Sequence, residues 1–211
     1  MRNLTIHDSH IKVDQRLRRA AIRLIADDDD ATPETAAMGQ ALEYERKTVR
    51  MRVDAWELAV ILVAIWVQRV QRRDQAVGKA TADLVKALNA YTDEPAVAAV
   101  LPLAVPSPAS TAIRGLADET QRHYVANLID RVKAAPGMPA KVLQRLAALE
   151  GAVAKLEAAV IARREAEHAE YQARRELDLA VAAAREVFNA MYFRVGALFP
   201  KDKARVEAYF G

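Results

Sequence analysis

The sequence predicts an all-α fold: an elongated antiparallel helical bundle with two long coiled-coil-like helices and two shorter helices. Three observations favour this fold class. Only 7 glycines and 8 prolines occur in 211 residues, and most of the prolines are clustered, so long segments contain no helix breaker. Much of the apolar content is alanine, the best helix former. Alternating runs of β-branched and aromatic residues, which are typical of strands, are nearly absent.

Caps and breakers divide the chain into segments. Ser9, or the aspartate before it, is a suitable N-cap for the first helix. Thr32-Pro33-Glu34 combines a cap, a proline suited to the first helical position and an acid in the first turn, so it predicts the start of the second helix. A proline-punctuated link precedes the third helix, and Pro136-Gly137-Met138-Pro139 predicts a hard turn. We expect one domain, residues 1–211, with helices over 9–26, 34–91, 110–134 and 140–199, a short C-terminal turn over 202–209 and room for a short helix at 95–101.

The second helix carries a thirteen-residue apolar run, residues 55–67. It is too short to span a bilayer, which needs about 20 residues. Around it, apolar residues recur at spacings of four and three from Val49 to Tyr91, interrupted only by Asp74 and Thr81, a pattern typical of a coiled-coil seam. Glu57 falls on a narrow polar strip of the helix, so we expect it to be solvated. A second apolar face exists only in the middle of the helix and comprises Leu58, Leu62, Ile65 and Trp66.

The last long helix repeats the seam spacing at both ends but not at its centre. There the register would place Arg163, Glu167, Glu170 and Arg174 in the seam, and charges are very costly to bury unpaired. A parallel stripe of small residues offers another face: Ala162, Ala166, Ala169 and Ala173. We therefore predict that the seam shifts onto alanine, which would pack against the tryptophan-bearing centre of the second helix in an antiparallel pair.

Candidate metal ligands are sparse. Glu165 and His168 form a Glu-x-x-His pair, but ferritin-like di-iron bundles use two such pairs and two further glutamates, and no second pair occurs here. The aspartates 27–30 lack the alternating spacing of an EF-hand loop. The chain has no cysteine, which excludes disulfides and cysteine-ligated zinc. We expect no metal and no cofactor.

A basic stripe lies along the first helix: Lys12, Arg16, Arg19 and Arg23. It could bind a phosphate backbone or acidic lipid headgroups. Aromatic residues do not interleave with it, and a net charge of +3 is too small to indicate nucleic acid. Pairing with glutamates of neighbouring helices is the simpler interpretation. We do not expect nucleic-acid binding.

No serine–histidine–acid or glycine-rich phosphate motif is present. We expect a non-enzymatic structural or scaffolding bundle that acts through protein–protein contacts and forms a homo-oligomer, its shorter helices leaving apolar surface uncovered. The predicted association face comprises Leu58, Leu62, Ile65, Trp66, Phe188, Tyr192, Phe193 and Phe199. One alternative is an amphipathic bundle at a membrane or lipid surface, and a further one is a ferritin-like metal-binding bundle. The first residues contain no apolar signal region, so we expect a cytoplasmic protein.

Overall fold

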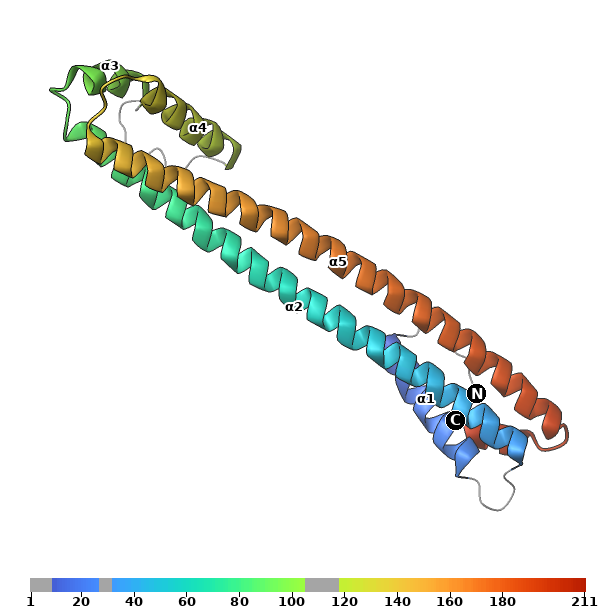
Figure 1. Cartoon of the computed structure of the whole chain (residues 1–211). Coiled ribbons are helices and arrows are strands. Elements are labelled where there is room, and N and C mark those ends of the chain that lie inside the picture. The colour runs from blue at the N-terminus through green and yellow to red at the C-terminus, as the bar shows by residue number, and fades with distance from the viewer. Residues whose placement is uncertain (1–8, 27–31, 105–117) are drawn as a thin grey trace. The chain divides into compact units, whose positions relative to one another are not determined.

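The computed structural model describes residues 9–26, 32–104 and 118–211 (Figure 1). These residues form the helices α1 (His10–Ile25), α2 (Pro33–Asn89), α3 (Pro95–Ala104), α4 (Asp118–Ala134), α5 (Ala140–Leu198) and α6 (Lys203–Phe210), with no strand among them. The predicted all-α bundle with two long helices is confirmed. Residues 110–117, which we expected to begin the helix now seen as α4, lie outside the described residues.

The chain divides into two compact units: unit 1 comprises Met1–Val63 and Ala166–Gly211, and unit 2 comprises Ala64–Glu165. Helices α2 and α5 contribute a segment to each. The expectation of a single domain over residues 1–211 stays a prediction.

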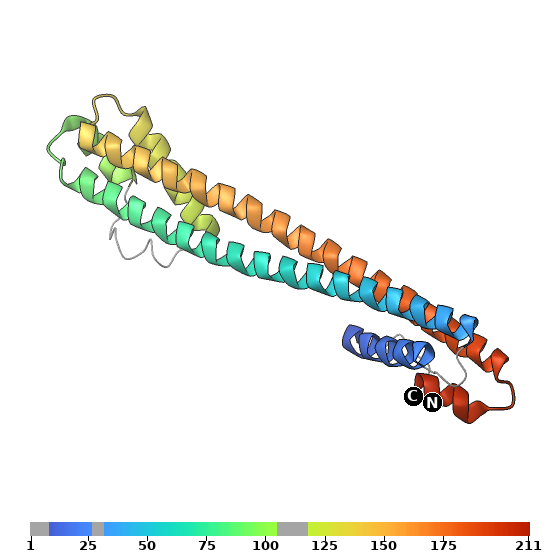
Figure 2. The ribbon, with the colours of Figure 1, turned by 60° about the horizontal axis from the view of Figure 1, so that its bottom comes forward.

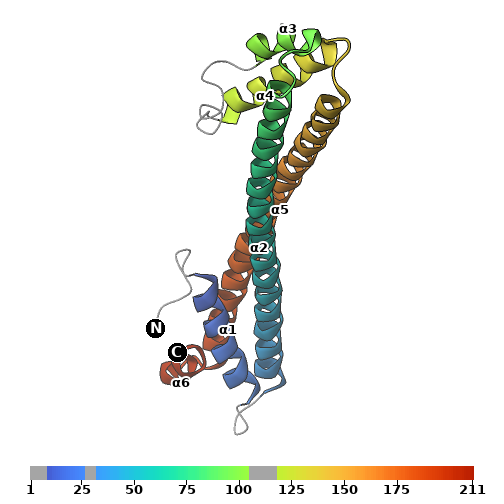
Figure 3. The ribbon, with the colours of Figure 1, turned by 90° about the vertical axis from the view of Figure 1, so that its left-hand side faces the viewer.

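Unit 1 packs α1 and α6 against the first part of α2 and the last part of α5. The two short helices contact each other (Figure 3). The side chains of Leu17, Leu42, Phe188 and Val195 are buried in its core, together with Phe210 from α6. The long helices run antiparallel here, because Arg52 pairs with Glu176 whereas Trp56, further along α2, bonds Glu170, which is earlier in α5.

Unit 2 packs α3 and α4 beside the remaining segments of α2 and α5 (Figure 2). Its buried core draws on all four helices, with Leu84 and Leu88 from α2, Val97 from α3, Leu128 from α4 and Leu149 from α5. At the hard turn between α4 and α5, Gly137 adopts a positive φ of 75°, a conformation that side-chain-bearing residues rarely adopt. The predicted turn is therefore present.

The capping residues explain why the helices begin where they do. Ser9 caps α1 by accepting a hydrogen bond from the backbone N–H of Lys12. At α2, the backbone N–H of Thr35 donates to the Thr32 hydroxyl (3.1 Å), and the backbone N–H of Thr32 donates to the Thr35 hydroxyl (3.0 Å). This reciprocal pair satisfies two N–H groups that the helix itself leaves without partners.

The predicted seam of α2 is buried unevenly. Val49 is fully buried in unit 1, whereas Val60 in the same unit is 41% exposed. In unit 2 the seam is buried again at Val77 and Leu84, and Thr81 between them is buried too. The Thr81 hydroxyl donates a hydrogen bond to the Val77 carbonyl (2.9 Å), which satisfies it without a partner on another helix.

Candidate functional site

Polar and aromatic side chains surround Trp56 in unit 1. The indole N–H donates to Glu170 Oε1 (2.9 Å), and the Arg174 guanidinium lies 5.7 Å from the ring centroid. The His10 ring meets the indole edge-on at 6.2 Å. We expected the seam to shift from the charged residues of α5 onto alanine. This shift is incomplete, because Glu170 is half-buried and accepts a hydrogen bond from Trp56.

The alanine stripe is present only in part. In unit 1, Ala166 and Ala173 are half-buried, as expected for a close helix contact, whereas Ala169 is exposed. The Trp56 ring meets the longer side chains of Glu170 and Arg174, and its packing against alanine stays a prediction.

The middle of α2 carries an apolar face that is open to solvent within unit 1. We call it the α2 face and define it by Met51, Ala55, Leu58 and Leu62, with Ile61 beside it. The side chains of Met51, Leu58 and Leu62 are 57%, 58% and 43% exposed. The first four residues recur at spacings of four, three and four, which places them on one side of the helix. Glu57 is exposed outside this line, as the sequence indicated.

The other two α2 residues of the predicted association face lie in unit 2. Ile65 is 41% exposed. Trp66 is half-buried, and the Arg69 guanidinium lies 4.4 Å from its ring centroid. A cation–π contact of this kind covers one side of the indole, so Ile65 is the more accessible of the two.

The predicted aromatic end of α5 does not form one surface. Phe188 is buried in the core of unit 1, where its ring meets Phe210 edge-on at 5.2 Å. We therefore remove Phe188 from the association face, because α6 folds back over it. Tyr192 and Phe199 are half-buried and pack against the aromatic residues of α6. Phe193 remains exposed.

The predicted basic stripe of α1 also divides. Arg23 donates to the backbone carbonyls of Ala208 (2.5 Å) and Gly211 (3.1 Å), so it caps the end of α6. Arg16 is half-buried, whereas Lys12 and Arg19 are exposed. These partners of Arg23 are backbone carbonyls, whereas we expected the stripe to pair with glutamates of neighbouring helices.

The candidate metal pair does not acquire further ligands. Glu165 is exposed at the end of unit 2. His168, in unit 1, is exposed too, with Nε2 lying 2.8 Å from the side-chain amide nitrogen of Gln172. Over residues 9–26, 32–104 and 118–211, no three acidic or histidine side chains come together as a metal site requires. Residues 27–30, the other acidic cluster considered, lie outside this part of the chain.

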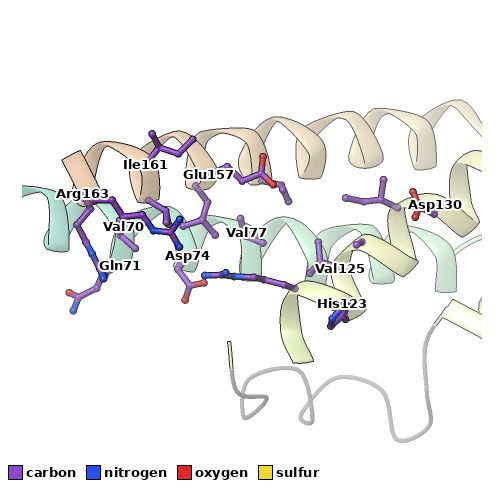
Figure 4. Close-up of a pocket in the computed structure, with 17 residues that line it drawn as sticks. Val70, Gln71, Asp74, Val77, His123, Val125, Asp130, Glu157, Ile161 and Arg163 are labelled. Carbon is purple, nitrogen blue, oxygen red and sulfur yellow. The ribbon is translucent and has the colours of Figure 1, made fainter. Parts of the chain in front are cut away.

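A groove of about 880 Å³ lies in unit 2 between α2, α4 and α5 (Figure 4). Val70, Val77, Val125 and Ile161 are among the aliphatic side chains of its wall. Three arginines and three acids also line it, so their formal charges cancel: Arg122, Arg163 and Arg164, with Asp74, Asp130 and Glu157. The groove combines an aliphatic wall with charges of both signs, so its net charge favours neither an anion nor a cation.

Two electrostatic features accompany these surfaces. In unit 1, Arg46 donates two hydrogen bonds of 2.7 Å to the Glu43 carboxylate, and this contact lowers the pKa of Glu43 below its ordinary value. In unit 2, burial raises the pKa of Tyr124, whose hydroxyl is buried without a hydrogen-bond partner in the described structure. A buried hydroxyl in this state favours the neutral phenol.

Comparisons with known proteins identify no relative: no family model, curated protein or solved structure matches this chain. Within the described ranges, no helix has an apolar stretch long enough to cross a membrane. The surfaces themselves must therefore indicate a function.

Sequence reasoning missed the exposed isoleucines of α1, Ile11 and Ile22, because they lie outside the heptad positions that direct attention to a core.

Proposed function

We propose that this protein is a non-enzymatic scaffold that associates with itself through the α2 face. The observation that carries the proposal is the exposure of Met51, Leu58 and Leu62 on one side of a long helix. Contiguous apolar surface of this kind on a folded protein is typical of an interaction site. Single exposed leucines would need no such explanation.

The spacing of the α2 face indicates the type of partner. Four residues separated by four, three and four positions match the a and d positions of a coiled coil, so the complementary surface is another helix with the same spacing. A second copy of the chain supplies such a helix, and a twofold interface pairs one patch with itself. Because Leu58 and Leu62 are 58% and 43% exposed, burying what remains exposed of each would contribute about 0.7–1.5 kcal/mol.

Flanking residues are compatible with a helix partner. Arg50, Asp54 and Glu57 are exposed on one side of the α2 face and carry both signs of charge. Charged residues beside an apolar centre are usual at the edge of a protein interface. We also propose that the protein is cytoplasmic, as expected from the sequence.

The test uses sedimentation velocity at micromolar concentration. It compares the wild type with a double variant in the α2 face and with a single variant outside it. Leu58→Lys with Leu62→Lys places two charges in the α2 face and should convert an oligomer to a monomer. Leu179→Lys is the matched control, because Leu179 is a 63% exposed leucine on α5 in the same unit and lies outside the α2 face. A wild-type protein that sediments as a monomer would contradict the proposal.

A further inference from the structure

The solvent-facing side of α1 combines arginines with isoleucines and carries no acid. Three isoleucines and four basic residues of this helix are exposed. The one acid of α1, Asp14, is half-buried and lies 3.6 Å from Arg46. We define the α1 outer face by Ile11, Lys12, Arg18, Arg19 and Ile22, all of which are exposed.

The arrangement follows from helix geometry. Ile11 and Ile22 are eleven residues apart, close to three turns of 3.6 residues, so they lie on the same line. Arg18 falls on one flank of that line, and Arg19 and Lys12 fall on the other. The buried residues of α1, which include Val13 and Leu17, lie on the opposite side of the helix and pack into the core. The helix is therefore apolar on both sides, with its positive charge on the outer one.

The exposed aliphatic side chains are large. Ile11 is 59% exposed and Ile22 is 53% exposed, whereas other apolar residues of the same short helix are buried in the core. An apolar line flanked on both sides by basic residues is typical of helices that lie in the interface of an anionic membrane. The isoleucines would enter the acyl boundary, while the arginines and the lysine reach the headgroup phosphates.

From this geometry we propose that the α1 outer face binds the surface of a membrane that contains anionic lipids. Charge complementarity selects this occupant, because every charged residue of the face is basic. A second copy of the same face is disfavoured, since like charges would meet. Nucleic acid would use the basic residues but leave both isoleucines without an apolar partner, and the face has no aromatic side chain on which a base could stack.

Two groups of acids near the α1 outer face reduce the attraction. Glu43 is the α2 carboxylate whose pKa Arg18 helps to lower, and it is already held by two hydrogen bonds from Arg46. Four aspartates, residues 27–30, follow α1 in the sequence, and their charge opposes binding to an anionic surface. Changing these four to asparagine should therefore strengthen the binding.

The experiment is vesicle flotation with the full chain. Vesicles of phosphatidylcholine with phosphatidylserine should bind the protein at low salt, and pure phosphatidylcholine vesicles should bind it much more weakly. Each basic residue near an anionic surface contributes a factor of about five, so Arg18→Gln with Arg19→Gln should weaken binding roughly 25-fold. Ile22→Ser should weaken it about tenfold, because the apolar insertion is lost.

Arg72→Gln with Arg73→Gln is the matched control, since both arginines are exposed on α2 in unit 2 and the net charge changes equally. This variant should retain nearly wild-type binding. Circular dichroism checks that all variants stay helical. The proposal is overturned by absence of binding at low salt, by equal binding to neutral vesicles, or by equal losses in the two arginine pairs. Efficient competition by duplex DNA, with no effect of Ile22→Ser, would assign the face to nucleic acid instead.

Discussion

Phe188 and Phe193 lie on the same helix five residues apart, and the structure gives them opposite environments. Phe188 is 1% exposed in the core of unit 1, with the Phe210 ring 5.2 Å away at an interplanar angle of 89°. Phe193 is 64% exposed, and its ring centroid lies 5.8 Å from that of Tyr192. The two phenylalanines therefore form a matched pair for measuring how much the α6 contact contributes to the stability of unit 1.

Phe188→Ala should lower the free energy of unfolding by about 3–5 kcal/mol, the range for truncating a buried phenylalanine. With a urea dependence of about 2 kcal/mol per molar, the midpoint should fall by roughly 1.5–2.5 M. Phe193→Ala removes an exposed ring and one aromatic contact, so its cost should stay below about 1 kcal/mol.

Tryptophan fluorescence during urea unfolding measures both variants. The chain has two tryptophans, and a Trp66→Phe background leaves only Trp56, which lies in unit 1. The emission then reports the unit that contains both phenylalanines. A cost below about 1 kcal/mol for Phe188→Ala, or equal costs for the two substitutions, would refute the placement of Phe188 under α6.

Four further substitutions test other positions. Gly39→Ala should destabilise the fold by about 1–3 kcal/mol, because a Cβ there would lie 2.7 Å from a side-chain carbon of α1 and 3.0 Å from an α1 carbonyl oxygen. Gly78 has open space around it, so Gly78→Ala should stabilise the fold by about 0.5–1 kcal/mol. Thermal melts measure both variants. Glu43→Gln should lower the urea midpoint at pH 7, and this loss should shrink as the pH falls below 4.5. The pKa of Glu43 is lowered by its arginine partner, so its stabilising contribution is present above the ordinary value of 4.5 and is lost as the pH falls through the folded-state pKa. Trp56→Phe should cost about 1–3 kcal/mol, since Glu170 loses the indole donor, and an unchanged midpoint would contradict that hydrogen bond.

The positions of the long helices could be predicted from the sequence because local signals determine them. Thr32 and Pro33 start α2, and the turn around Gly137 separates α4 from α5, as the breakers indicated. The heptad spacing also identified Val49 and Leu84 as core residues. These features depend on residues that are close together in the chain, so one sequence suffices to find them.

The burial of individual residues on α5 could not be predicted in the same way. Phe188 is buried because α6, which follows a turn at the end of α5, folds back and places Phe210 against it. Glu170 stays in the seam because Trp56, 114 residues away in the sequence, donates a hydrogen bond to it. Both outcomes depend on long-range partners that periodicity does not reveal.

The candidate surfaces show the same limit. Leu58 and Leu62 were predicted for association and are exposed on the α2 face, but the heptad pattern alone could not tell an exposed face from a buried one. The α1 outer face was missed as a combined surface, because the basic residues and the isoleucines were considered separately. The burial of Val13 and Leu17 leaves the side with Ile11 and Ile22 exposed.

Sedimentation velocity of the wild-type chain and of Leu58→Lys with Leu62→Lys tests self-association most directly. The wild-type protein should sediment as a dimer or larger species at micromolar concentration, and the double variant should sediment as a folded monomer. The Leu179→Lys control should match the wild type. A wild-type monomer, or an oligomer that the double variant leaves intact, would contradict assembly through the α2 face.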